Sequence, residues 1–160
     1  MKNLGLLFLS LTCIAFVSCK KNQSQPVEGV PQVQAEMPIS KQCYKAIYEQ
    51  DTVDLEVSTL KDGAITGNME MKVFNMPNKV GKIAGEFRGD TLFASYTFIQ
   101  GTNDKITYKN PMAFLKKGEE LILGNGKIEN NMGASYFVKD TPIEFEQVKY
   151  KFSKVDCIDK

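Results

Sequence analysis

From residue 43 onward, hydrophobic and polar residues alternate along the chain in short runs, which is the pattern of half-buried β-strands. The clearest run covers residues 52–58, in which Val53, Leu55 and Val57 face one side and polar residues face the other. Further runs lie at 65–74, 80–88, 91–100, 105–116, 121–129, 134–138 and 149–157. Together with a first strand that starts at Cys43, they predict about nine short strands.

Turn residues separate these runs at close intervals. Asp62-Gly63 and Gly89-Asp90 are tight hairpin signals, and the glycine of Lys117-Gly118-Glu119 marks a third turn. Pro111 indicates a bulge or an edge position in its strand, and the segment 142–147 begins with proline and carries two glutamates, which predicts a short helical turn. An antiparallel meander of roughly eight strands closes naturally into an up-and-down barrel. A two-sheet sandwich is the alternative.

Residues 1–18 form a targeting segment that precedes the fold. Lys2 is followed by a nearly all-apolar run, which has the length of a signal-peptide core and is too short to span a bilayer as a helix. The sequence Phe16-Val17-Ser18-Cys19 then resembles a lipobox, although phenylalanine holds the usual leucine position. We therefore predict cleavage before Cys19 and lipidation of that cysteine with diacylglycerol and an N-linked acyl chain such as palmitate. An ordinary signal peptide with an incidental cysteine is the alternative.

Residues 19–42 are predicted to be a disordered tether, because glutamines and prolines dominate and the few valines have no period. Residues 43–160 then form the folded domain. Attachment to the membrane rests on the lipid at Cys19, since two or more acyl chains anchor stably. No acidic cluster follows Cys19. An acidic cluster directly after the lipidated cysteine would resemble a surface-export signal. Because this chain has no such cluster, we expect an outer-membrane lipoprotein of the cell envelope that faces the periplasm.

The remaining cysteines suggest one disulfide. Cys13 is discarded with the leader, which leaves Cys43 and Cys157 near the two ends of the domain. An exported chain meets an oxidising compartment, so these two cysteines are expected to pair. Two unpaired buried thiols are the alternative. A zinc site is disfavoured, because the chain has no histidine and zinc sites use several Cys or His ligands.

Charge and composition exclude several classes of function. The chain has 20 basic and 19 acidic residues, and loss of Lys2 leaves 19 of each, so the mature protein is neutral and offers no electrostatic footprint for nucleic acid. The absence of histidine removes the commonest general base. Asp54, Glu56, Glu70 and Glu86 fall on the polar faces of strands. We predict no catalytic residues, no metal and no cofactor.

Several short motifs carry a resemblance to known proteins. They are Ser18-Cys19-Lys20-Lys21, Cys43-Tyr44, Gly89-Asp90-Thr91-Leu92 with Tyr96, Ala113 to Gly118, Gly124-Asn125-Gly126 and Lys154 to Cys157. The chain from Cys43 to Cys157 resembles small flavobacterial-type (Bacteroidetes) lipoproteins. The resemblance implies a calycin- or lipocalin-like β-barrel and supplies no activity.

The expected function is that of a non-enzymatic envelope binding module. An eight-stranded barrel either fills with its own side chains or holds one small ligand. Methionines and glycines on the inward face suggest an apolar ligand pocket, formed by Met69, Met71, Gly85, Phe87, Tyr96, Phe98 and Phe114. A packed core in which glycines mark bends is the favoured alternative. If the core is packed, the binding function would be that of an outer surface that binds another envelope protein. A protein inhibitor similar to the periplasmic lysozyme inhibitors ranks lower, because their Ser-Gly and Tyr-x-Cys loop motifs are absent.

Overall fold

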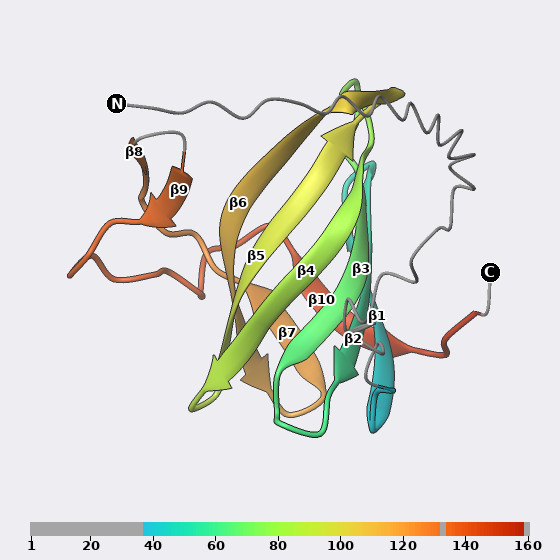
Figure 1. The fold of residues 1–160 in the computed structure, drawn as a ribbon, viewed down its shortest axis with the longest axis vertical. Coiled ribbons are helices and arrows are strands. Elements are labelled where there is room, and N and C mark those ends of the chain that lie inside the picture. Colours follow the sequence, from blue (N-terminus) through green and yellow to red (C-terminus); the bar gives the residue numbers. More distant parts are fainter. Residues whose placement is uncertain (1–36, 132–133, 159–160) are drawn as a thin grey trace, which may run out of the picture. The chain divides into compact units, whose positions relative to one another are not determined.

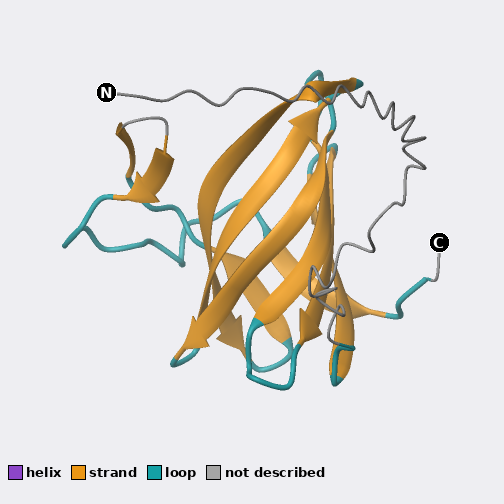
Figure 2. Ribbon diagram, viewed as in Figure 1, coloured by secondary structure: helices purple, strands orange, loops and turns teal. Residues whose placement is uncertain are grey.

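The computed structural model describes residues 37–131 and 134–158. These residues form ten strands and no helix, so the prediction of an all-β fold is confirmed (Figure 2). The strands are β1 (Ser40–Tyr48), β2 (Asp51–Thr59), β3 (Ile65–Lys72), β4 (Lys79–Arg88), β5 (Thr91–Gln100), β6 (Asn103–Lys117), β7 (Glu120–Leu123), β8 (Ile128–Asn131), β9 (Ala134–Phe137) and β10 (Lys151–Val155). The first strand begins at Ser40, so residues 40–42 belong to the barrel and not to a tether. The predicted leader and Cys19 lie outside the described residues.

Eight strands close into one antiparallel barrel in the order β1-β10-β7-β6-β5-β4-β3-β2 (Figure 1). From β1 to β7 each strand pairs with the next along the chain, so the expected meander is confirmed. Closure pairs β1 with β10, so neither the first nor the last strand of the meander is left as an open edge. The remaining strands, β8 and β9, form a separate two-stranded hairpin beside β6.

The tight turns lie where the sequence placed them. Gly63 and Gly89 adopt φ of 86° and 60°, which is the left-handed region that glycine enters without steric cost. The turn at Gly89-Asp90 sets the longest regular ladder, in which Arg88 pairs with Thr91 and each following pair steps outward to Lys79 and Gln100. The local turn residues thus fix the register of β4 on β5.

The barrel closes through a short seam at β10. Ten residue pairs join β4 to β5, whereas three join β1 to β10 and two join β10 to β7. The chain leaves the barrel after Leu123 and returns only at Lys151. The seam is therefore the part of the barrel with the fewest backbone pairs.

Two local predictions for this excursion are wrong. The expected strand 121–129 is divided into β7 and β8, because the chain turns away from the barrel at Gly124. The expected helical turn at 142–147 is absent, because the backbone of Glu144 pairs with Asn125 in an isolated bridge. Ile143 and Phe145 also pack over Gly124, where a Cβ atom would meet their side chains. These tertiary contacts override the helix-start signal.

The barrel interior is filled by one hydrophobic cluster. Its large members with no more than 2% exposure come from seven strands. They are the aromatic residues Tyr96, Phe114 and Phe152 and the aliphatic residues Val53, Leu55, Ile65, Met69, Ile83, Leu92 and Leu121. The alternation that predicted the inward faces of β2, β3 and β5 is thereby confirmed.

The alternation of buried and exposed residues that the run at 105–116 predicts is absent from the first half of β6. Ile106 and Tyr108 are 49% and 43% exposed, and every residue from 103 to 109 is exposed. The register shifts here, so that Ile99 on β5 lies opposite residues 104–107 on β6. Because β7 pairs only with residues 114–117, this half of β6 has a barrel strand on one side only. Pro111 lies beyond the end of β7, which agrees with its predicted edge position.

Candidate functional site

The predicted ligand residues divide into two groups. Met69, Tyr96 and Phe114 are at most 1% exposed, and Met71 and Phe98 are also buried, so five of the seven residues belong to the core. Gly85 and Phe87 instead line an open hollow on the side of the barrel. The alternating pattern predicts which side chains point inward. It does not predict whether those side chains fill the interior or leave a cavity.

Aromatic rings occupy the space that a lipocalin-type ligand would take. The Tyr96 and Phe98 rings stack with their centroids 4.6 Å apart, and Phe114 meets Phe152 edge to face at 5.8 Å. The Tyr96 hydroxyl donates a hydrogen bond of 3.1 Å to the backbone carbonyl of Met69. Burial also raises the pKa of Tyr96 well above its usual range, so this hydroxyl stays a neutral donor.

The inward-facing glycines do not open a cavity. A Cβ atom at Gly67 would overlap the carbonyl oxygen of Glu56, and one at Gly85 would overlap that of Phe93. These positions are close approaches of neighbouring strands at bends of the barrel, where only glycine fits. This geometry favours the packed-core alternative over an internal pocket.

An open hollow of about 710 Å³ lies beside β4 and β5. Its volume falls within the range typical of small-ligand sites. It is lined by consecutive residues of β4 and β5, by the turn at Asp62-Gly63, by part of β6 and by the hairpin residue Phe137. The polar side chains among them are Asp62, Glu86, Arg88 and Ser95.

A second hollow of about 210 Å³ adjoins the first, because Pro111, Met112 and Phe137 line both. Its other walls come from Asn110, from Leu123 to Gly126 and from Ile128. The two hollows thus form one groove that runs from the β2–β3 turn to the β8–β9 hairpin, and Phe137 is common to both parts. We call this feature the side groove.

The charged end of the side groove is an ion pair whose two side chains are 67% and 59% exposed. Arg88 approaches Glu86 Oε1 through Nη2 at 2.7 Å and donates to the same oxygen through Nε at 2.8 Å. The guanidinium also lies over the Phe93 ring, 5.3 Å from its centroid. The pair uses Nε and Nη2 of Arg88 and Oε1 of Glu86, and it does not involve Nη1 or Glu86 Oε2.

Some of these residues were open to sequence reasoning. A two-residue turn at Gly89-Asp90 places Glu86 opposite Phe93, as observed, so the cluster on the outer face follows from the hairpin. Phe137 carries no such signal, because its position depends on how the excursion folds back.

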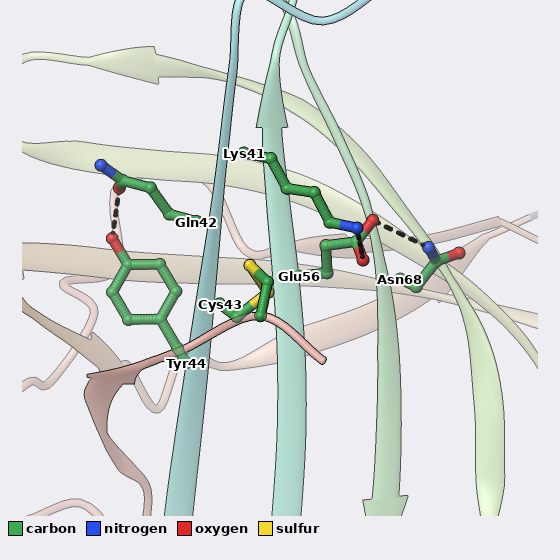
Figure 3. Close-up of a disulfide and its surroundings, with 7 residues drawn as sticks. Lys41, Gln42, Cys43, Tyr44, Glu56 and Asn68 are labelled. Carbon is green, nitrogen blue, oxygen red and sulfur yellow. Dashed lines mark hydrogen bonds and ion pairs between the residues drawn. A yellow bond between two sulfur atoms is a disulfide. The ribbon is translucent and has the colours of Figure 1, made fainter. Parts of the chain in front are cut away.

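The disulfide between Cys43 and Cys157 is confirmed, with the two Cα atoms 5.2 Å apart. Figure 3 shows it on β1 between the Tyr44–Gln42 hydrogen bond and the Lys41–Glu56 ion pair. Cys43 pairs with Val155 of β10, so the bond crosses the short closure seam. Cys157 is exposed, which places the bond at the surface of the barrel.

A buried carboxylate ties the excursion to the end of the barrel. Asp51 accepts hydrogen bonds from the Phe74 backbone N–H at 2.8 Å and from the Tyr150 hydroxyl at 2.7 Å. These two bonds lower the pKa of Asp51. Burial, together with the bond to Asp51, raises the pKa of Tyr150 to about 12. The cluster is a structural anchor, since both groups keep their ordinary charge state at neutral pH.

The carboxylates on the polar faces of the strands form ion pairs with basic side chains, and two of these pairs join β1 to β2. Glu56 lies 3.0 Å from Lys41, and Asp54 lies 3.2 Å from Lys45. Among the described residues, no three His, Cys, Asp or Glu side chains gather as a metal site would require. The same residues contain no helix with the length and hydrophobicity needed to cross a membrane.

Comparison with family models, with curated proteins and with solved structures returns no match to this chain.

Proposed function

We propose that this protein is an envelope lipoprotein that binds a ligand in the side groove of its barrel and has no enzymatic activity. The observation that carries the proposal is the contrast between a filled interior and an open groove of about 710 Å³ beside it. Ligand sites are usually concave surfaces with apolar walls and a few placed polar groups. In the side groove, Phe137, Pro111 and Met112 supply the apolar walls, and Arg88 and Glu86 supply the polar groups.

The proposed location rests on the sequence. Ser18-Cys19 after an apolar leader supports lipidation of Cys19 and retention at the periplasmic face of the outer membrane. Growth of the native bacterium with labelled palmitate would then label the wild-type chain, whereas Cys19→Ser would abolish the label. The matched control is Cys13→Ser, which lies inside the leader and would leave the label unchanged. Equal labelling of the wild type and Cys19→Ser would refute the anchor.

The absence of catalysis is supported by residue chemistry. The chain has no histidine, and the described carboxylates Asp54, Glu56 and Glu86 form exposed or half-exposed ion pairs. Binding therefore accounts for the groove better than turnover does.

The binding proposal is tested by native mass spectrometry. The full mature chain with Cys19→Ser, exported by its own host and purified without detergent, would carry a reproducible extra mass that is lost on denaturation. Phe137→Ala would lower the bound fraction, because Phe137 lines both hollows. Lys45→Ala, on the outer face of β1, is the control and would keep it. A bare mass for the wild type, or an extra mass equally present in Phe137→Ala, would contradict binding in the side groove.

A further inference from the structure

The side groove offers hydrogen-bond donors and acceptors together. Arg88 supplies only N–H donors, and Glu86 and Asp62 supply only acceptors as carboxylates. Glu86 uses one carboxylate oxygen for the pair with Arg88, and Arg88 uses Nε and Nη2. Nη1 and the second Glu86 oxygen therefore present a donor beside an acceptor. The partner that matches such a pair is a group that can both donate and accept, as a hydroxyl does.

The charge of the lining excludes the simplest ionic ligands. The charged residues that line the larger hollow are Asp62, Glu86 and Arg88, and the smaller hollow is lined by uncharged residues alone. An anion that approached Arg88 would meet the carboxylate of Glu86 at the same place, and a cation that approached Glu86 would meet Arg88. Asp62, the remaining charged residue, already accepts a hydrogen bond from the Ala64 backbone N–H. A fully apolar ligand would remove the Arg88–Glu86 pair from water without replacing its hydrogen bonds, which is costly. The ligand that suits this lining is neutral and polar.

The rest of the groove offers apolar surface. Phe137, Pro111 and Met112 line both hollows, and Ala84 and Phe87 add apolar lining to the larger one. Asn110 and Asn125 add amide groups at the far end. Sugar rings combine these requirements, because each carries hydroxyl groups at its edge and C–H groups on its faces.

From this lining we infer that the side groove binds a neutral polyhydroxylated ligand, an oligosaccharide of the envelope. Its ring hydroxyls pair with Arg88 and Glu86, and its C–H faces pack on Phe137 and Pro111. This inference rests on the proposed binding function and specifies the chemistry of that site.

The test is an NMR titration of the full mature chain carrying Cys19→Ser, with cellotetraose, chitotetraose and laurate as separate probes. We expect saturable shifts of the backbone amides of 84–88, 93–95, 112 and 137 with at least one of the tetrasaccharides, and none with laurate. Arg88→Ala and Phe137→Ala would each weaken that binding about tenfold, the equivalent of one lost hydrogen bond or apolar contact. Lys45→Ala would leave it unchanged.

Two outcomes overturn the inference, and they are distinguishable. Saturable laurate shifts at the same amides, with no response to either sugar, would mean that the ligand class is wrong and the binding function stands. No response to any probe, combined with a bare mass in the native mass spectrum, would refute both. An adequate circular-dichroism spectrum and disulfide content of each variant show that it has folded, so a loss of binding is not a loss of structure.

Discussion

Removal of the Cys43–Cys157 disulfide is expected to destabilise the barrel at its closure seam. The bond closes a loop with a sequence separation of 114 residues, for which the chain-entropy relation gives about 5 kcal/mol at 25 °C. Stabilities of single domains are roughly 5–15 kcal/mol, so the loss is a large share of the total. The disulfide lies at the closure seam, where only three residue pairs join β1 to β10 and two join β10 to β7.

The assay is urea unfolding of a chain that begins at residue 19 and carries Cys19→Ser, compared with the same chain that also carries Cys43→Ser and Cys157→Ser. We expect the unfolding free energy to fall by about 3–5 kcal/mol, since measured losses often lie below the entropic value. Wild-type chain in reductant is the matched control and should reach the same midpoint as the double variant. Hydrogen exchange should increase first in Lys151–Val155, because β10 has the fewest backbone pairs.

A loss below about 1 kcal/mol would refute this reasoning, because it would mean that the unfolded chain is not appreciably constrained by the bond. Uniform acceleration of exchange over all strands would contradict the local part of the argument. In that case the seam would open only with the whole barrel, and the small number of pairs at β10 would not be its weak point.

Three further predictions follow from the core, the bends and the buried carboxylate. Phe114→Ala should cost about 3–5 kcal/mol of unfolding free energy in chemical denaturation and Tyr96→Phe about 1 kcal/mol, because the first leaves a cavity and the second removes one hydrogen bond; similar costs for both would contradict a tightly filled interior. Gly67→Ala should lower the unfolding free energy by about 1–3 kcal/mol in the same assay, since its Cβ would overlap a neighbouring carbonyl, and a neutral effect would show that the bend is soft. Because the pKa of Asp51 is lowered, its hydrogen bonds stabilise the fold above the ordinary aspartate pKa, and this stabilisation is lost as pH falls through the folded value. Because the pKa of Tyr150 is raised, its contribution to stability is fully present below the ordinary tyrosine pKa and is lost as pH rises toward 12. Thermal unfolding across pH should therefore show a smaller acid-side loss in Asp51→Asn and a smaller alkaline-side loss in Tyr150→Phe, and unchanged pH profiles would contradict the pairing.

The candidate site was predictable only in part. Gly85 and Phe87 were expected at a ligand site because they lie on the inward pattern of β4, and they do line the side groove. Met69, Tyr96 and Phe114 have the same pattern and are core residues. Alternation reports which face a side chain takes, and it does not report whether the space in front of that face is already full.

The sequence by itself determined most strands of the barrel and the register of β4 on β5. Alternation at 52–58 and 91–100 and the glycine turns at 63 and 89 act over a few residues, so local sequence specifies them. Only the tertiary structure decided the interior and the excursion. Whether Tyr96, Phe98, Phe114 and Phe152 fill the barrel depends on how strands distant in sequence face one another. The path of 124–150 depends on the backbone bridge between Asn125 and Glu144 and on the packing of Phe137 beside the barrel. These contacts join residues that are distant in sequence, so no short window of sequence predicts them.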